Sequence, residues 1–346
     1  MPVGADPALT SGRQFFLPMK FPTSSRTLTA LAGISLITPA FATVNIGYVT
    51  VGNGGNANDT TGYGAVVDTY QIAQNETTIS QYAEFLNVKA QTDTYGLYST
   101  SMGSDLNIAG ITRSGVSGSY SYSVVAGSGN RPISYVSWFD AARFTNWLGN
   151  GQGSGSTETG AYTLSGATSG IFTKNVGATV WIPSESEWYK AAYYDPNKGG
   201  AGVGGYWQQA NQSNTMAGNT IGVANSANFY DGDYVGSGSA SFPTGNALTD
   251  VGAYGLNSDS AYGTNDQAGN VFEWNDAVIG SSRGLRGGAW YAASDGLPAS
   301  YRNDVPPAYQ GSFIGFRVAS VPEPSAVVLT VLSVSACLTR RRRSTL

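Results

Sequence analysis

The sequence predicts a mixed domain in which short helices and short strands are joined by long ordered loops. Glycine is abundant, with 46 copies in 346 residues, and charged residues make up only 12% of the chain. This composition favours loops and short strands over long helices. Helical periodicity interrupts it at residues 77–87, 136–148 and 182–192, where we expect short helices.

The N-terminus is expected to be an export signal. The run 27–42 is largely apolar, follows Lys20 and Arg26, and closes with Ala-Phe-Ala. A basic flank, a short apolar core and a small-x-small exit are typical of a signal peptide, so residues 1–42 are expected to be removed. Met19 lies much closer to this core than the first methionine does, which leaves open a start at Met19.

The C-terminus, residues 321–346, resembles a PEP-CTERM sorting tail. It holds Pro322-Glu323-Pro324, a mostly apolar stretch at 325–339 and four arginines at 340–343. The resemblance implies that a sorting protease acts at the Pro-Glu-Pro motif, while the apolar run is held in the membrane and the arginines stay cytoplasmic. Because 325–339 is shorter than the roughly 20 residues of a permanent span, we expect a transient anchor.

The region between these ends, residues 43–320, is expected to form one acidic domain. It keeps 11 of the 18 basic residues and 20 of the 22 acidic ones, so its net charge is near −9. Binding to nucleic acid needs clustered Lys or Arg against phosphate, so we expect no nucleic-acid partner. An acidic surface suits a soluble protein of the cell envelope.

Cysteine and histidine usage restricts the chemistry further. The single cysteine, Cys337, lies in the sorting tail, and the chain has no histidine. The domain therefore has no disulfide, and Ser-His-Asp catalysis, Cys-His catalysis and histidine-ligated zinc or iron are excluded.

The first helix is expected to begin after Thr78, which forms a capping box with Gln81. Its apolar face would hold Ile79, Tyr82, Phe85 and Leu86. Strands are expected at 179–182 and 315–318. Glycine-rich connections are expected at 149–156, 198–205 and 232–238.

The second and third helices carry similar start signals. Ser137 can cap the second helix, Asp140 lies in its first turn, and Gly149 is placed to end it. The third helix has a capping box formed by Ser184 and Glu187. Its inward-facing residues would be Trp188, Ala191 and Ala192.

Five motifs follow one another in a characteristic order. They are Arg131-Pro-Ile-Ser-Tyr-Val-Ser-Trp-Phe-Asp-Ala-Ala, Ile182-Pro-Ser-Glu-Ser-Glu-Trp, Tyr262-Gly-Thr-Asn-Asp-Gln-Ala-Gly-Asn-Val-Phe-Glu-Trp, Leu285-Arg-Gly-Gly-Ala-Trp and Gly315-Phe-Arg. The series resembles the formylglycine-generating enzyme, or sulfatase-modifying factor, family from about Tyr70 to Val318. The resemblance implies an irregular α+β fold related to C-type lectins, with short helices, small antiparallel sheets and long ordered loops.

The resemblance also bears on catalysis. Catalytic members of the family oxidise a substrate cysteine with oxygen and a copper ion held by two cysteines, and the corresponding positions here are Ala292 and Leu297. Neither residue can ligate copper, and family members that form sulfur-carbon bonds use histidine-ligated iron. We therefore expect no copper, no catalytic residue and no bound organic cofactor. An oxidoreductase with altered chemistry at the same pocket is the alternative.

Calcium is the metal that we expect this chain to bind, because the resemblance implies calcium within its loops. Its ligands would be a side-chain oxygen of Asp266, the carbonyls of Gly269 and Val271, the carboxylate of Glu273, and, at a second position, Asn228 with the carbonyl of Phe229. Calcium prefers about six to eight oxygen ligands, which this set could supply in part. Alternatively, Glu273 is a hydrogen-bonded partner within an aromatic turn.

Other candidate residues have simpler interpretations. Arg286 and Arg317 are expected to be buried ions paired with carboxylates or carbonyls. The pairs Glu185/Glu187 and Asp231/Asp233 are too common in loops and caps to indicate acid/base catalysis. The stretch 291–309 could stack sugars on tyrosines, or it could be an ordinary surface loop.

Together these patterns predict an exported protein of a Gram-negative-type bacterium. It would lie in the cell envelope, on the outer surface or in the extracellular matrix, with a binding or structural role and a glycan or protein ligand.

Overall fold

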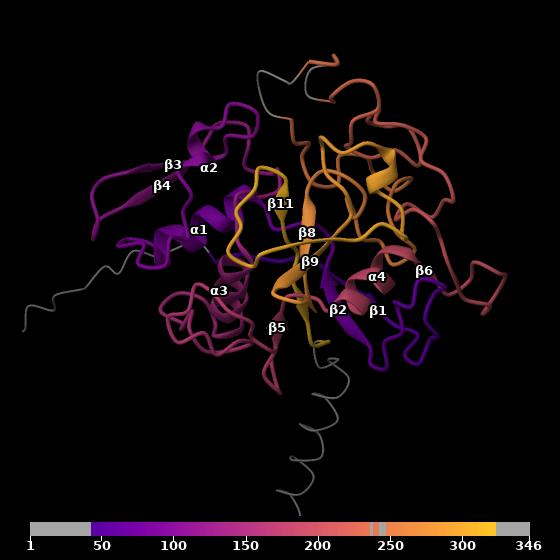
Figure 1. Cartoon of the computed structure of the whole chain (residues 1–346), viewed down its shortest axis with the longest axis horizontal. Helices are drawn as coiled ribbons and strands as arrows, with labels where there is room; N and C mark the ends of the chain where they lie inside the picture. The colour runs from indigo at the N-terminus through magenta and orange to yellow at the C-terminus, as the bar shows by residue number, and fades with distance from the viewer. Residues whose placement is uncertain (1–42, 236–237, 242–246, 323–346) are drawn as a thin grey trace, which may run out of the picture. The chain divides into compact units, whose positions relative to one another are not determined.

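The computed structural model describes residues 43–235, 238–241 and 247–322. The predicted signal peptide and nearly all of the predicted sorting tail, including the apolar run 325–339, lie outside these residues. Within the described ranges, no helix is long and apolar enough to cross a membrane. The elements are short and loops connect most of them, which confirms the predicted irregular α+β fold (Figure 1).

The first sheet joins the two ends of the described chain. Its strand order is β1 (Tyr48–Val51), β2 (Tyr70–Ala73), β12 (Ala319–Ser320) and β5 (Val180–Trp181). All of its pairings are antiparallel, and Ala319 of β12 lies opposite both Ile72 and Trp181. The predicted strand at 179–182 is confirmed as β5.

The second sheet is built around a hairpin. Its order is β10 (Asn303–Val305), β9 (Ser282–Arg286), β8 (Phe272–Ile279) and β11 (Ile314–Gly315). Strand β11 runs parallel to β8, while the other two pairings of this sheet are antiparallel. The predicted strand at 315–318 is corrected, because only Gly315 is in a strand and residues 316–318 connect β11 to β12.

Two further pairs of strands are antiparallel hairpins. They are β3 (Ile111–Ser114) with β4 (Ser121–Val124), and β6 (Tyr194–Asp195) with β7 (Gly205–Tyr206).

The three predicted helices are present, and each begins with a full capping box. They are α1 (Ile79–Lys89), α3 (Trp138–Gly149) and α4 (Glu185–Tyr193). Asp140 lies in the first turn of α3, as predicted, and its carboxylate also completes the capping box with Ser137. Gly149 is the last residue of α3 rather than its terminator, and Asn150 caps the end. Neither α2 (Ser101–Ser104) nor the short 3-10 turn Ser294–Gly296 was predicted from the sequence.

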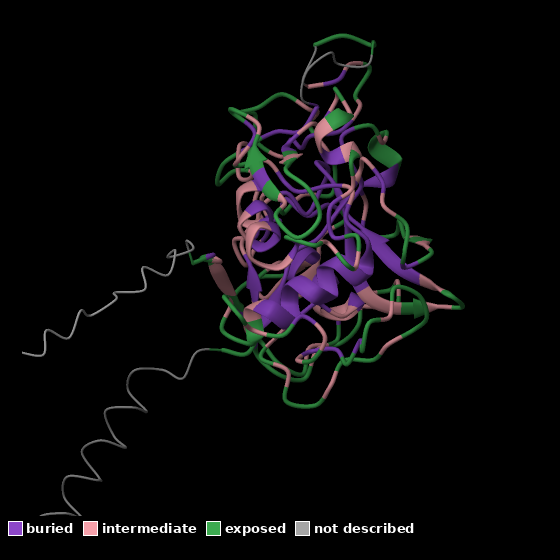
Figure 2. Cartoon of the chain, turned by 90° about the vertical axis from the view of Figure 1, so that its left-hand side faces the viewer, coloured by how far each residue is buried: buried purple, intermediate pink, exposed green. Residues whose placement is uncertain are grey.

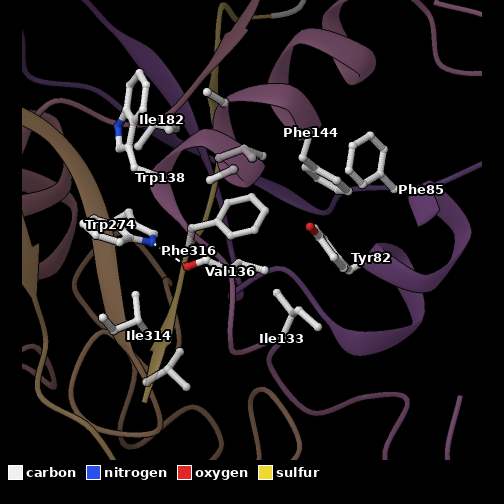
Figure 3. Close-up of a cluster of buried hydrophobic side chains, with 14 of the residues drawn as sticks. Tyr82, Phe85, Ile133, Val136, Trp138, Phe144, Ile182, Trp274, Ile314 and Phe316 are labelled. Carbon is white, nitrogen blue, oxygen red and sulfur yellow. Dashed lines mark hydrogen bonds between the residues drawn. The ribbon is translucent and has the colours of Figure 1, made fainter. Parts of the chain in front are cut away.

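Aromatic side chains from α1, α3 and the chain after β11 form the main core (Figure 3). The rings of Phe85 and Phe144 lie 5.4 Å apart, and Phe144 lies 5.4 Å from Phe316. Trp274 of β8 donates its indole N–H to the carbonyl of Val136 at 2.9 Å. Such pairs add to the burial of apolar area, so the two helices and the second sheet share one interior. Figure 2 shows the buried residues gathered in the middle of the domain.

A second buried cluster lies on the inner face of α4. Trp188, Tyr189 and Tyr193 of this helix pack with Phe229 and Leu297 from later loops. The rings of Tyr189 and Tyr193 are 4.7 Å apart. This cluster packs α4 against the loops that contain Phe229 and Leu297, two positions that the resemblance links to metal binding.

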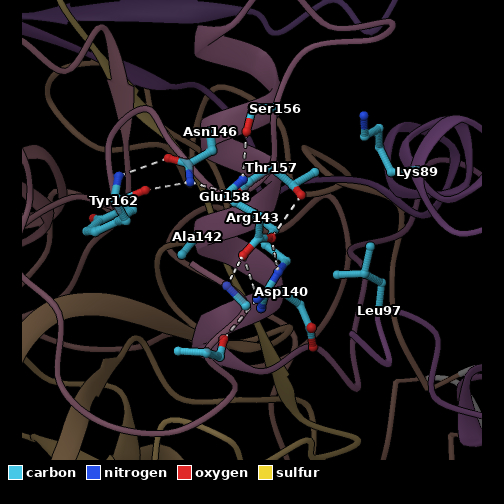
Figure 4. A network of polar contacts seen from close by, with 12 residues as sticks. Lys89, Leu97, Asp140, Ala142, Arg143, Asn146, Ser156, Thr157, Glu158 and Tyr162 are labelled. Atoms are coloured by element: carbon cyan, nitrogen blue, oxygen red, sulfur yellow. Dashed lines mark hydrogen bonds and ion pairs between the residues drawn. The ribbon is translucent and has the colours of Figure 1, made fainter. Parts of the chain in front are cut away.

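A polar network explains how the long loop after α3 is ordered (Figure 4). Arg143 donates to the Glu158 carboxylate at 2.8 Å and to the carbonyl of Ala167 at 2.9 Å. Asn146 donates to the carbonyls of Thr157 and Tyr162, both at 2.8 Å. Side chains of one helix thus satisfy backbone groups that have no sheet to join.

Candidate functional site

Glu273 in β8 is fully buried and paired with Arg317. Its Oε2 accepts from Arg317 Nε at 2.6 Å and from the indole N–H of Trp188 at 2.8 Å, while its Oε1 accepts from Arg317 Nη2 at 2.7 Å. Both side chains have 0% exposure. This geometry matches the alternative in which Glu273 is a hydrogen-bonded partner, and its role as a calcium ligand stays a prediction.

The expected structural role of Arg317 is confirmed. Its remaining N–H groups donate to the carbonyls of Ala73, Gln74 and Asn265 at 2.8–3.1 Å. Burial opposes the charge, but the Glu273 carboxylate outweighs this effect and raises the pKa of the guanidinium. A buried charge that is paired and fully hydrogen-bonded is the form in which proteins tolerate one.

Two more buried carboxylates lie near this pair. Glu76 accepts from the backbone N–H of Val271 at 3.3 Å and from Asn270 at 3.1 Å, and Asp266 accepts from the N–H of Gly252 at 2.6 Å. Burial raises the pKa of Glu76 well above its ordinary value and that of Asp266 to about 6. We call Glu76, Asp266, Glu273 and Arg317 the Glu273 centre, which holds three acids and one arginine.

The structure brings the two predicted calcium positions side by side. The N–H of Asn270 donates to the carbonyl of Asn228 at 2.8 Å. Gly269 has a φ of +82°, and a Cβ there would lie 2.3 Å from the Asn228 oxygen, so only glycine fits. Asn228 donates to Ala247 and Asn270, but its buried Oδ1 has no partner within the described residues.

The oxygen atoms of the predicted calcium ligands are of the right chemical type, but several of them already accept hydrogen bonds. Carboxylate, amide and carbonyl oxygens are the ligands that calcium prefers. However, Arg317 and Trp188 already use the oxygens of Glu273, and the carbonyl of Phe229 accepts from Asn219 at 3.3 Å. Across the described ranges, no three Asp, Glu, His or Cys residues converge as a metal site. Among the predicted side-chain ligands, the Oδ1 of Asn228 is the buried oxygen without a hydrogen-bond partner in the described part of the chain.

A second ion-pair centre, in which arginines outnumber acids, lies at the start of α4. Glu185 accepts from Arg286 at 2.7 and 2.9 Å and from Arg302 at 2.6 and 2.7 Å. Arg286 also donates to the carbonyls of Ala299 and Tyr301, both at 2.7 Å, which confirms its expected structural role. We call Glu185, Arg286 and Arg302 the Glu185 centre. Its carboxylate is committed to two arginines, so it is not available as a catalytic acid or base.

The positions that would hold copper are apolar. Leu297 is fully buried in the α4 cluster and Ala292 is half-buried against the main core. The surrounding stretch presents three tyrosines, Tyr291, Tyr301 and Tyr309, which are 36–43% exposed. The rings of these tyrosines contact those of Phe272 and Phe313 at centroid distances of 4.9–6.2 Å. We call these five residues the aromatic surface.

Sequence reasoning missed Glu76 and Arg302. Glu76 lies two residues before the helix cap Thr78, where a solvated acid is the usual interpretation, and Arg302 follows a tyrosine in a stretch without periodicity. Only the long-range packing places Glu76 beside residues 270–271 and Arg302 beside the N-terminus of α4.

The model of the sulfatase-modifying factor enzyme 1-like domain family matches residues 35–321. No curated protein matches the sequence.

Among solved structures, the chain is similar to CarF, with 20% identity and a TM-score of 0.48 over 81% of this chain and 99% of that one. It is also similar to Treponema denticola variable protein 1, with 19% identity and a TM-score of 0.47 over 82% and 100%. For PvdO from Pseudomonas aeruginosa the values are 17% and 0.39 over 80% and 92%. The family model covers most of the sequence, and the chain therefore belongs to the sulfatase-modifying factor enzyme 1-like domain family.

Proposed function

We propose that this chain is an exported, non-catalytic member of its family with a binding or structural role at the cell surface. One observation carries the proposal. At the positions to which the family resemblance assigns the two copper-binding cysteines, the chain has Ala292 and a fully buried Leu297. A buried leucine that packs against Trp188 and Tyr193 stabilises the interior and offers no ligand to a metal.

The aromatic surface supports a binding role. Partly exposed tyrosines offer a flat apolar face together with a hydroxyl group, a combination enriched at interfaces. Phe313 contacts the rings of both Tyr291 and Tyr309, so the exposed rings rest on a packed support. The ligand of this surface would be a glycan or a protein.

The two ends of the sequence support export. The signal peptide and the sorting tail would direct the chain through the membrane, with the tail as a transient anchor until the sorting protease acts at Pro322-Glu323-Pro324. The mature protein would then reside in the envelope or the extracellular matrix. Replacing the three residues by alanine is expected to leave the protein in the membrane fraction, and normal release would contradict this part of the proposal.

Calcium would serve as a structural ion near the Glu273 centre. The support is electrostatic: three buried acids share one arginine, burial raises the pKa of Glu76 and of Asp266, and a divalent cation would stabilise their ionised forms. A ligand bound only by the native state adds ~2.7 kcal/mol at a hundredfold excess over its Kd, so chelation is expected to lower the Tm. An unchanged melting curve in chelator, together with metal analysis that finds no calcium, would contradict the assignment.

The alternative is an oxidoreductase with altered chemistry at the same pocket. Incubation with copper and a cysteine-containing peptide decides between the two. We expect no oxygen consumption and no aldehyde product from the native chain. Oxidation of the peptide by the folded chain, and not by the same chain unfolded in urea, would favour the enzyme.

A further inference from the structure

A cavity of about 480 Å³ opens between three segments that are distant in the sequence. They are residues 59–61, 198–214 and 298–300. The volume lies within the ~300–1,000 Å³ of small-ligand sites in proteins. The cavity shares no residue with the aromatic surface or with the Glu273 centre.

One wall of the cavity is aromatic and fixed in place. Tyr206 and Trp207 are consecutive residues at the end of β7. The indole N–H of Trp207 donates to Asp195 at 3.1 Å, and the hydroxyl of Tyr206 donates to the carbonyl of Ala57 at 2.8 Å. Because each polar tip is held, the two rings form a preorganised wall, which reduces the entropy lost on binding.

The rest of the lining carries both donors and acceptors. The Asp59 carboxylate is held by the hydroxyl of Tyr189 and by the N–H of Thr60 at 2.7 Å. Gln208 and Asn214 are exposed amides at the opposite segment, where Asn214 Oδ1 accepts from the N–H of Gln208 at 3.4 Å. This contact positions the Asn214 side chain, while its amide nitrogen and the Gln208 side chain keep capacity for a ligand.

Charge in the cavity is balanced. Lys198 donates to the carbonyl of Tyr206 and its Nζ lies 4.6 Å from the centre of the Trp207 ring. Its positive charge is thus held against the aromatic wall. Asp59 supplies the compensating negative charge.

We propose that this cavity binds a saccharide. The apolar face of a sugar ring would pack on the wall of Tyr206 and Trp207. Its hydroxyl groups, which both donate and accept, would bond to Asp59, Gln208 and Asn214. A polyanion is disfavoured by the Asp59 carboxylate, and an apolar ligand would leave these polar groups without partners.

The Glu185 centre contacts one residue of the cavity lining and holds it in place. Ala299, which lines the cavity, donates its N–H to the carbonyl of Gln208 at 2.8 Å and accepts from Arg286 at 2.7 Å. The inference adds a ligand class and a location to the proposed function. It does not depend on the loss of oxidase chemistry, so the copper and oxygen assay can fail or succeed independently of it.

The test uses the full chain on an array of neutral and acidic oligosaccharides, followed by tryptophan-fluorescence titration with cellotetraose, maltotetraose, diacetylchitobiose and digalacturonic acid. We expect at least one array saccharide to bind. Trp207→Ala should then weaken the affinity by about tenfold or more, and Asn214→Ala by about fivefold. Gln91→Ala, which removes an exposed amide outside the cavity, is the matched control and should bind normally.

Melting curves separate loss of binding from loss of fold. Asn214 is exposed, so its variant should keep the native Tm even if Trp207→Ala lowers it. The inference is overturned if no saccharide on the array binds, if inorganic phosphate binds equally well, or if Asn214→Ala leaves the affinity unchanged. It is also overturned if Tyr309→Ala, on the aromatic surface, abolishes saccharide binding while Trp207→Ala does not.

Discussion

The Glu273 centre and the Glu185 centre use the same ion-pair chemistry in opposite proportions. In both, arginine and glutamate approach to 2.6–2.7 Å. The Glu273 centre has three acids for one arginine and its ion pair is wholly buried. The Glu185 centre has one acid for two arginines, and the side chain of Arg302 is 32% exposed.

The difference shows what each centre can tolerate. Removing Arg317 would leave a buried carboxylate without a counter-ion, which is among the most costly changes a protein interior can undergo. Removing one arginine from the Glu185 centre leaves the other to neutralise the carboxylate. Charge balance and solvent access, rather than contact distance, should therefore rank the effects of mutation.

Arg317→Met should have the largest effect. It removes the counter-ion of Glu273 and the hydrogen bonds to three carbonyls, and we expect a loss of ~3–5 kcal/mol in the free energy of unfolding. Urea denaturation followed by circular dichroism measures it. Arg317→Lys keeps the charge and should lose less. A loss below ~1 kcal/mol for the methionine variant would mean that something else, such as a bound cation or a proton, compensates Glu273.

Asp140 provides a buried carboxylate with no arginine bonded to it. Burial raises its pKa to about 6, although hydrogen bonds from Ser137 and Gln310 oppose the shift. The native state then binds more protons than the unfolded state between pH ~4 and 6, so stability should fall as the pH rises through this window and level off above it, by at most ~3 kcal/mol.

Asp140→Asn isolates this contribution. The variant should show a smaller decline in unfolding free energy between pH ~4 and 6 than the native chain. An identical pH profile in both proteins would show that Asp140 does not titrate in that range.

Arg286→Met should have an intermediate effect. The side chain is buried and supports two carbonyls, but Arg302 still neutralises Glu185, so we expect a loss of ~1–3 kcal/mol. Thermal and urea unfolding provide the measurement. A loss equal to that of Arg317→Met would show that charge balance does not separate the two centres.

Arg302→Gln should have the smallest effect. This arginine is a third exposed, and ion pairs in contact with solvent contribute ~0–1 kcal/mol. The double variant with Arg286→Met completes the comparison, because it leaves Glu185 without any cation. We expect the combined loss to exceed the sum of the two single losses, and simple additivity would contradict the shared neutralisation of Glu185.

Features encoded over a few residues could be predicted from the sequence. The capping boxes of Thr78 with Gln81 and of Ser184 with Glu187 depend on local spacing, and both are confirmed. The pairing of Arg286 and Arg317 with carboxylates or carbonyls could also be predicted, because a buried guanidinium requires such partners. The identity of the carboxylate could not.

Long-range packing decided the rest. The parallel pairing of β11 with β8 and the approach of Glu76 to residues 270–271 join segments with no periodic relation. The cavity beside Trp207 combines three such segments.

The sequence by itself determined that the described domain has neither cysteine nor histidine, that it begins its helices at defined caps, and that it follows the motif order of its family. These are properties of composition and of short spacings. The tertiary structure decided which acids are buried together, which arginine neutralises each of them and where a cavity remains. Those outcomes depend on desolvation and on contacts between residues more than a hundred positions apart, which no local pattern specifies.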